Sequence, residues 1–397
     1  GGNGNVYVNG SSPTIKNSTI QKSGSYGVYV TGTPAAPVLQ ATAIKDNTGI
    51  GLYLNQGSLS LTGMTFSGTG GAYSMSLPPT LTVATAGTHT IDKPIELRYG
   101  TVNADTTWRK LGAPYVSSGT VFVYKDATTA STLTIEPGVE VRFGANTYLY
   151  VGAGTTKGAL KAVGTATAPI KFTSNQVTKT AGYWYGLRFD PGSSNLSVLD
   201  YATVEYGGYG GNGNVYVNGS SPTIKNSTIQ KSGSYGVYVT GTAAAPIFQS
   251  TAIKDNTGIG LYYGATTGGL SLTGMTFSGT GGTYSMSLPS TLTVTTSGTH
   301  AIDKPIELRA GTVNADTTWR KLGAPYVSSG IVYVYKDTST ASTLTIEPGV
   351  EVRFGANTYL YVGSGTTYKG ALKAVGTATA PIKFTSNQVT KTAGYWY

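Results

Sequence analysis

Residues 1–33 read GGNGNVYVNGSSPTIKNSTIQKSGSYGVYVTGT, and the same letters return unchanged at residues 210–242. Residues 34–185 recur as residues 243–397, with few positions altered and two small insertions. One insertion turns the loop Asn55–Gly57 into Gly264–Gly268, and the other adds Tyr368 before Lys369. The chain is therefore a tandem array with a period of 209 residues, and such a repeat outranks any local pattern as a guide to the fold. We expect two units without a linker, 1–209 and 210–397, the second shorter by about one coil of the kind described next.

A shorter period lies inside each copy. Three short segments alternate apolar and aromatic residues, VYV at 6–8, VYV at 28–30 and LYL at 52–54, at steps of 22 and 24 residues. Two further apolar columns keep similar steps: Ile15, Leu39, Leu61, and Ile20, Ile44, Phe66. Alternation with period two predicts strands that place Val and Leu on one face and Tyr on the other. Short strands with no room for a crossover helix can lie parallel only as stacked coils of a solenoid.

Composition supports an all-β chain with a narrow core. Gly accounts for 56 residues and Tyr for 29, whereas charged residues are only 11% of the chain. Residues 131–144, STLTIEPGVEVRFG, predict two strands joined by a corner at Pro137-Gly138, because proline removes a ladder donor and glycine accepts positive φ. In these strands we expect Leu133 and Val141 to point inward and Glu140 and Arg142 to point outward.

Four segments carry a resemblance to known proteins: SPTIKNSTI at 12–20, TLTIEPGVEVRFG at 132–144, GALKAVGTATAPIKFTSN at 158–175 and WYGLRFDPGSSNLSVLDYATVEYGG at 184–208. They resemble the coils of bacterial extracellular right-handed parallel β-helix repeat proteins. The resemblance implies an all-β, right-handed parallel β-helix (β-solenoid) with about 22–27 residues per coil, continuous through the tandem repeats. Because that family includes surface fibres, adhesins and polysaccharide-active enzymes, the resemblance does not decide the function.

Charge and cysteine content narrow the classes of partner. The chain has no Cys, which excludes disulfides, thiolate metal sites and a Cys nucleophile. It has no apolar run long enough to span a membrane as a helix. The formal net charge of +10 is spread over both copies without a basic block, so we expect no nucleic-acid partner. Anionic polysaccharide or cell-wall polymer is the partner that such a charge would attract, besides end-to-end or lateral contacts between copies of the protein itself.

The residues that could carry catalysis are scattered. Enzymes similar to pectate lyases and polygalacturonases need clustered carboxylates, either to hold Ca²⁺ or as an acid and base pair. In the first copy the acids fall mostly one to a coil: Asp46, Asp92, Glu96, Asp105, Asp126, Glu136, Glu140, Asp190, Asp200 and Glu205. We expect them to be outward charges paired with Lys93, Arg98 or Arg142. His89 and its copy His300 are predicted to be turn or surface residues, so we expect no enzyme activity, metal or cofactor.

Tyrosine is the most informative surface residue. The alternation predicts an outward ladder of rings one coil apart, with Arg188 at the matching strand position ahead of the next copy: Tyr7, Tyr29, Tyr53, Arg188, Tyr216, Tyr238 and Tyr262. Such a ladder would stabilise the stack, make lateral contacts in a bundle, or offer a platform for sugar rings. These three roles stay open at this point.

The sequence as a whole predicts a non-catalytic structural protein located outside the cell or on its surface, as a filament or stalk. The alternatives are a polysaccharide-binding or polysaccharide-cleaving surface protein similar to pectate lyases, and the stalk of a cell-surface adhesin. Strand patterns run across the copy boundary, in WYGLRF, LSVLDYATVEY and GNVYV. We therefore expect one uninterrupted solenoid through residues 185–240, with Leu199 stacked on Ile224.

Overall fold

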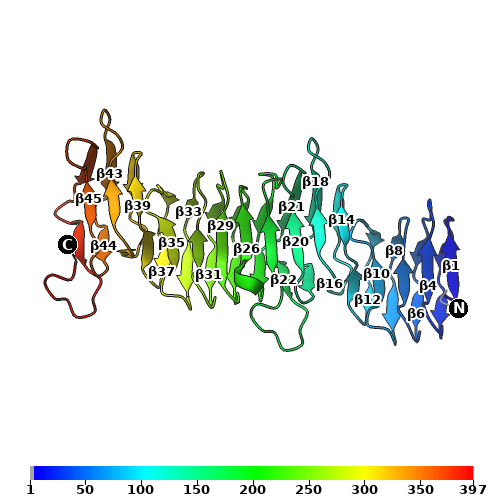
Figure 1. Cartoon of the computed structure of the whole chain (residues 1–397). Coiled ribbons are helices and arrows are strands. Elements are labelled where there is room, and N and C mark those ends of the chain that lie inside the picture. The colour runs from blue at the N-terminus through cyan, green and yellow to red at the C-terminus, as the bar shows by residue number, and fades with distance from the viewer. Residues whose placement is uncertain (1–3, 397) are drawn as a thin grey trace. The chain divides into compact units, whose positions relative to one another are not determined.

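The computed structural model describes residues 4–396 and divides the chain into two compact units, Gly1–Gly207 and Gly208–Tyr397. Each unit is a β-solenoid in which short parallel strands stack coil upon coil (Figure 1). The expected all-β fold with parallel coils is confirmed. The expected continuity across residues 185–240 stays a prediction.

The first unit winds three strands into each coil and has three faces. Its first sheet holds β1 (Val6–Asn9), β4 (Val28–Thr31), β7 (Leu52–Leu54), β10 (Met75–Leu77), β13 (Ile95–Leu97), β16 (Tyr115–Ser117), β19 (Glu140–Phe143), β22 (Ile170–Ser174) and β25 (Ala202–Glu205). The second face holds β2 (Thr14–Lys16), β5 (Val38–Gln40), β8 (Ser60–Thr62) and β11 (Ala84–Ala86), then β14 (Gly100–Val102), β17 (Val121–Val123), β20 (Tyr148–Val151) and β23 (Gly186–Phe189). The third holds β3 (Thr19–Gln21), β6 (Ala43–Lys45), β9 (Thr65–Ser67) and β12 (Thr90–Ile91), then β15 (Thr106–Trp108), β18 (Ser131–Ile135), β21 (Gly158–Val163) and β24 (Val198–Asp200).

The second unit opens with the single-turn 3₁₀ element η1 (Tyr209–Gly211) and repeats this arrangement. Its longest sheet holds β26 (Gly213–Asn218), β29 (Tyr235–Thr240), β32 (Leu261–Tyr263), β35 (Met286–Pro289), β38 (Ile306–Arg309), β41 (Tyr326–Ser328), β44 (Glu351–Phe354) and β47 (Lys383–Ser386). A second face holds β27 (Thr223–Lys225), β30 (Ile247–Gln249), β33 (Ser271–Thr273) and β36 (Thr295–Ser297), then β39 (Gly311–Val313), β42 (Val332–Val334) and β45 (Leu360–Val362). The third holds β28 (Thr228–Gln230), β31 (Ala252–Lys254), β34 (Thr276–Ser278) and β37 (Ala301–Ile302), then β40 (Thr317–Trp319), β43 (Ser342–Ile346) and β46 (Gly370–Ala374).

The inward columns expected from the sequence are confirmed. Ile15 pairs with Leu39, and Leu39 with Leu61, so one apolar side chain of each coil rests on the next. Leu39 and Leu61 are buried, whereas Ile15 is half-buried because it belongs to the first coil of the unit. The outward and inward alternation around Pro137-Gly138 also holds, and Gly138 has a φ of 76° at the corner.

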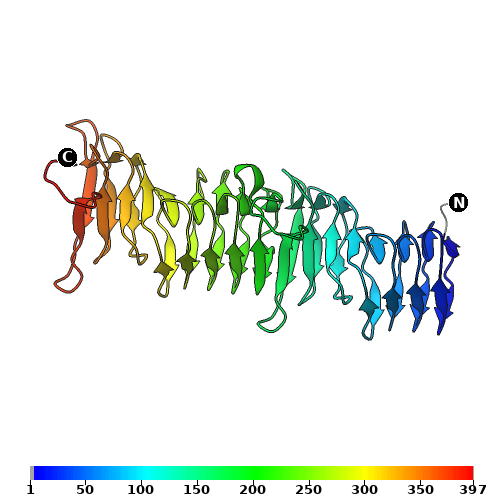
Figure 2. The ribbon, with the colours of Figure 1, turned by 90° about the horizontal axis from the view of Figure 1, so that it is seen from below.

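Coil length varies more than the expected 22–27 residues. The first step follows the sequence period, with Val6 paired to Val28. The step shortens to 20 residues where Met75 pairs with Ile95, and lengthens to 32 where Phe172 pairs with Val204. The strands keep their register in the long coils because the additional residues form loops between strands, which leave the core unchanged (Figure 2).

The first coils of the first unit turn one of their corners with a residue in the left-handed region. At the corner between the second and third faces, Asn17, Ala41 and Gly63 have φ values of 48°, 45° and 54° and follow one another coil by coil. The backbone N–H of Ala41 donates to the carbonyl of Thr62 in the next coil, so these corners also stack. Asn and Gly tolerate positive φ, which explains their frequency at these positions.

Candidate functional site

The predicted tyrosine ladder of the first unit lies on the outer side of its first sheet. Tyr7 pairs with Tyr29 and Tyr29 with Tyr53 in the parallel register. Their ring centroids are 5.6 and 5.2 Å apart, and the ring planes are 13° and 6° from parallel. Parallel strands hold side chains at the coil spacing, which brings aromatic rings into offset stacking distance. The column is therefore a stack of rings that faces solvent, with Tyr7 47% exposed.

A fourth ring widens this stack. Tyr26, in the corner before β4, lies 5.4 Å from Tyr29 and 5.1 Å from Tyr53, tilted by about 40° to both. Burial among the neighbouring phenols raises the pKa of Tyr29. Its hydroxyl therefore stays protonated at neutral pH and is available only as a neutral hydrogen-bonding group.

Arg98 closes one end of the stack. Its guanidinium lies over the Tyr53 ring, 4.6 Å from the centroid. It also donates to Ser76 Oγ at 2.9 Å and to the carbonyl of Leu54 at 2.6 Å. Ser76 in turn donates to Glu96 at 2.5 Å. The cation, which follows β13, is thus held by the two preceding coils, which favours a stabilising role for this end of the ladder.

The second unit carries the same side chains with different ring tilts. Tyr216 and Tyr238 are 5.3 Å apart and inclined by 57°, and Tyr238 and Tyr262 are 5.2 Å apart and inclined by 44°. Arg309 again lies over the last ring, 4.5 Å from the centroid of Tyr262. The spacing is therefore set by the coils, whereas the tilt of the rings differs between the two copies.

Arg188 lies in a different column from the Tyr7, Tyr29 and Tyr53 ladder of its own unit. It belongs to β23 on the second face, where it pairs with Tyr150 and lies 5.0 Å from that ring. Its Nε donates to Asp190 Oδ1 at 2.9 Å, and the Tyr150 hydroxyl donates to the same carboxylate. Burial and this carboxylate raise the pKa of Tyr150 to about 12. The expectation that Arg188 precedes Tyr216 concerns residues of two units and stays a prediction.

This second face of the first unit has an aromatic cluster that the sequence analysis did not single out. Phe122 lies 5.6 Å from Tyr150, and Tyr148 stacks on Tyr185 at 4.1 Å and 3°. The alternating segments VFVY and YLYV carry the signal for it, in the same form as the VYV segments. The unit therefore has two outward aromatic columns on adjacent faces.

His89 was expected in a turn or at the surface; it lies in a turn, but it is buried. It follows β11 in a turn, but its side chain is only 7% exposed. Its Nδ1 accepts a hydrogen bond from the backbone N–H of Met64 at 3.0 Å, and its Nε2 lies 2.6 Å from the Thr85 hydroxyl. Burial lowers the pKa of the imidazole. The sequence could not predict this because the backbone donor belongs to another coil, and His300 repeats the arrangement with Met275.

The carboxylates mostly tie one coil to the next. Asp92 was expected to pair with a cation, but it accepts from the backbone and hydroxyl of Thr69 and from the hydroxyl of Ser74. Glu136 is paired with Arg109 at 2.7 Å, and Glu140 with Arg142 at 2.8 Å as expected. Within residues 4–396, no three His, Asp or Glu side chains are grouped so as to hold a metal ion.

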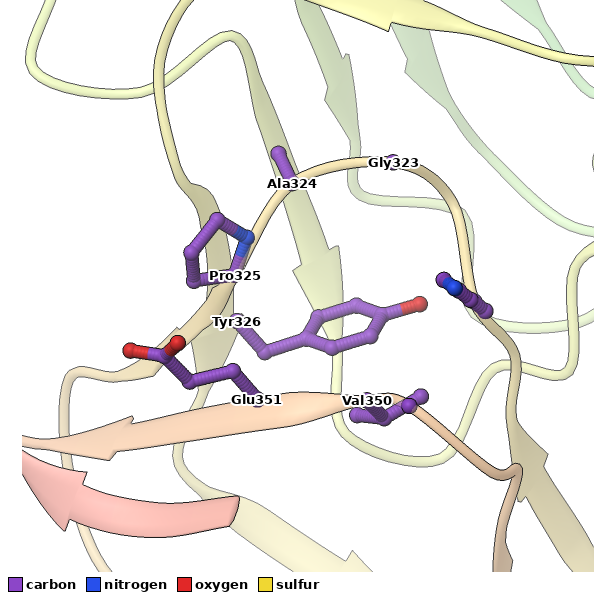
Figure 3. A pocket seen from close by; sticks show the side chains of 8 residues that line it. Gly323, Ala324, Pro325, Tyr326, Val350 and Glu351 are labelled. Carbon is purple, nitrogen blue, oxygen red and sulfur yellow. The ribbon is translucent and has the colours of Figure 1, made fainter. Parts of the chain in front are cut away.

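A small hollow recurs at one corner of each unit. In the second unit it measures about 210 Å³ and is lined by Lys321, Gly323, Ala324, Pro325, Tyr326, Gly349, Val350 and Glu351 (Figure 3). The Tyr326 hydroxyl donates to the carbonyl of Arg320 at 2.6 Å, and Glu351 is bonded to Arg353 at 2.7 Å. Its volume is below the range of about 300–1,000 Å³ usual for ligand pockets, so we regard it as a feature of the corner packing.

Comparison of the chain with protein families, with curated proteins and with solved structures finds no match. Among the described residues, no helix has the length and apolar character needed to cross a membrane.

Proposed function

We propose that this chain is a non-catalytic structural segment of an extracellular filament or cell-surface stalk, built from tandem β-solenoid units. The observation that carries the proposal is that polar side chains form hydrogen bonds between neighbouring coils. Groups that could do chemistry instead connect neighbouring coils: Asn47 accepts from the backbone N–H of Ser23, His89 from that of Met64, and Asp92 from that of Thr69. A carboxylate or imidazole held in this way contributes to the cohesion of the stack.

The core supports the same proposal. Large buried side chains contact one another between coils, as in the stack of Phe143 on Trp184 at 4.1 Å and 5°. The Trp184 Nε1 donates to the carbonyl of Glu205 at 2.9 Å, so the ring is anchored as well as packed. In a solenoid each coil is stabilised chiefly by its neighbours, so such contacts add strength along the stack.

Electron microscopy of recombinant chains with one, two and four copies of the unit tests the structural part. We expect slender particles that lengthen by about 40 Å for each added copy. This length follows because one copy holds about eight coils and each coil adds about 4.8 Å. Particles whose length does not follow the number of copies would contradict the filament proposal.

An assay with polygalacturonate, with and without Ca²⁺, tests the non-catalytic part. We expect no release of unsaturated products or reducing ends beyond that of a heat-denatured control. Release above this control would favour the polysaccharide-cleaving alternative.

A further inference from the structure

A groove of about 640 Å³ lies on the loops that leave the second face of the first unit. It crosses three successive coils, because its walls are the loop after β17, the loop after β20 and the loop after β23. The side chains that matter for its chemistry are Thr128, Thr155, Lys157, Ser193 and Ser194. This volume lies within the range of about 300–1,000 Å³ found for ligand sites.

The walls are held together by hydrogen bonds between the loops. The backbone N–H of Lys157 donates to the carbonyl of Asp126 at 2.8 Å, and that of Ser194 donates to the carbonyl of Gly158 at 2.7 Å. A Cβ on Gly192 would lie 1.9 Å from the carbonyl oxygen of Thr156, so glycine allows the second and third walls to meet. The groove is therefore formed before any ligand arrives, which lowers the entropy lost on binding.

The lining combines hydroxyl groups, small apolar side chains and one cation. The backbone N–H of Leu196 donates to Ser194 Oγ at 3.2 Å, so that hydroxyl can donate its own proton elsewhere. Lys157 is exposed at the rim and is the one charged residue among those that line the groove. The nearest carboxylate of the first wall, Asp126, is occupied by the backbone N–H groups of Thr128 and Thr129 at 2.8 and 2.7 Å. Sugar rings present hydroxyl edges and apolar C–H faces, and an acidic sugar adds the anion that a lysine would attract.

The comparison of the two copies points to the same loops. Over the residues that the two copies share, they differ in length at two places, and both are loops. Tyr368 is inserted at the equivalent of the second wall, where its ring lies 5.0 Å from Tyr335. The other insertion, within Gly264–Gly268, lines a separate hollow of about 290 Å³. The strands of the coils are thus kept while the loops change, as in scaffolds that carry their binding residues on loops.

We propose that the groove formed by loops 127–130, 154–157 and 191–194 binds an acidic oligosaccharide, with Lys157 contacting a carboxylate of the sugar. The ligand runs along the stack of coils, so the groove would give a structural segment a means of holding a polysaccharide matrix.

Isothermal titration calorimetry of the full chain with a galacturonic acid hexamer tests the proposal. We expect binding that is about tenfold weaker in Lys157→Gln and undetectable in Thr155→Trp, whose indole would fill the groove from the tip of the second wall. Lys161→Gln is the matched control, because Lys161 is an exposed lysine on β21 outside the groove. Its affinity should equal that of the unmodified chain.

Three results would overturn the proposal: no binding by the unmodified chain, an equal loss in Lys161→Gln, or equal affinity for a neutral cello-oligosaccharide of the same length. Unchanged unfolding midpoints of both groove variants distinguish a lost contact from a misfolded chain. Because the filament experiment depends on coil stacking and this one on a surface groove, either proposal can fail while the other holds.

Discussion

The phenol rings of Tyr29 and Tyr53 are stacked 5.2 Å apart and 6° from parallel, although 24 positions separate them in the chain. This distance follows from the register of β4 and β7, which pairs the two residues directly. Aromatic stacking on this surface is therefore a consequence of coil winding, and it should contribute to stability wherever the register is kept.

The contact between Tyr53 and Arg98 should be measurable as a coupling energy. In a double-mutant cycle of Tyr53→Ala and Arg98→Ala, we expect an interaction of about 0.5–1 kcal/mol from unfolding in denaturant, because the cation lies over a half-buried ring. The equivalent cycle of Tyr262→Ala and Arg309→Ala should give a similar value. Additive effects in both cycles would show that these cations do not stabilise the ladders.

A charge placed in the inward column should be strongly destabilising. Leu61 is 1% exposed and packed between coils, so Leu61→Asp should lower the free energy of unfolding by about 3–5 kcal/mol through an unpaired buried carboxylate. The neighbouring Thr62→Asp, which points outward on the same strand, should change it by less than about 0.5 kcal/mol. Equal effects of the two substitutions in denaturant unfolding would contradict the assigned register.

Substitution of a corner glycine should change the stability of the fold only through the conformational preference of the backbone. Gly63 has a φ of 54° and no atom within 4 Å of the position where a Cβ would stand. Gly63→Ala should therefore cost about 1 kcal/mol from conformation without a steric clash. The control is Gly24→Ala, equally open but without positive φ, which should be neutral or stabilising by about 0.5 kcal/mol. The thermal unfolding midpoint should therefore fall in Gly63→Ala and stay unchanged or rise in Gly24→Ala; an equal fall in both variants would contradict the role of the positive φ.

The buried histidines should make stability depend on pH. Burial lowers the pKa of His89 and His300 in the folded chain, so the unfolded chain takes up a proton first as the pH falls. Their contribution is complete above the unfolded pKa of about 6.5 and is lost as the pH falls towards the folded pKa. The midpoint of denaturant unfolding should therefore be lower at pH 5 than at pH 7.5. This difference should be smaller in the double variant His89→Gln, His300→Gln. An unchanged pH profile in the double variant would mean that other groups are responsible.

Repetition made much of the fold predictable. The recurring VYV and LYL segments placed Val28 and Leu52 inside and Tyr29 and Tyr53 outside, and the observed register agrees. Period-two alternation is a local property of a strand, so one sequence suffices to assign its two faces. Where loops intervene, as between β22 and β23, the period is interrupted and coil length could not be inferred.

The partners of the polar side chains could not be predicted in the same way. Asp92 was expected to meet a cation, yet the hydroxyls of Thr69 and Ser74 reach it from the preceding coil. His89 was expected in a turn or at the surface; it lies in a turn, but a backbone donor of the preceding coil holds its ring inside. The groove at Thr155 and Lys157 likewise depends on three loops that are far apart in the chain. The repeat, the strand pattern and the spacing of the rings arise from local periodicity and can therefore be predicted from the amino-acid sequence. Which groups from different coils meet is set by winding and loop geometry, and only the folded chain decides it.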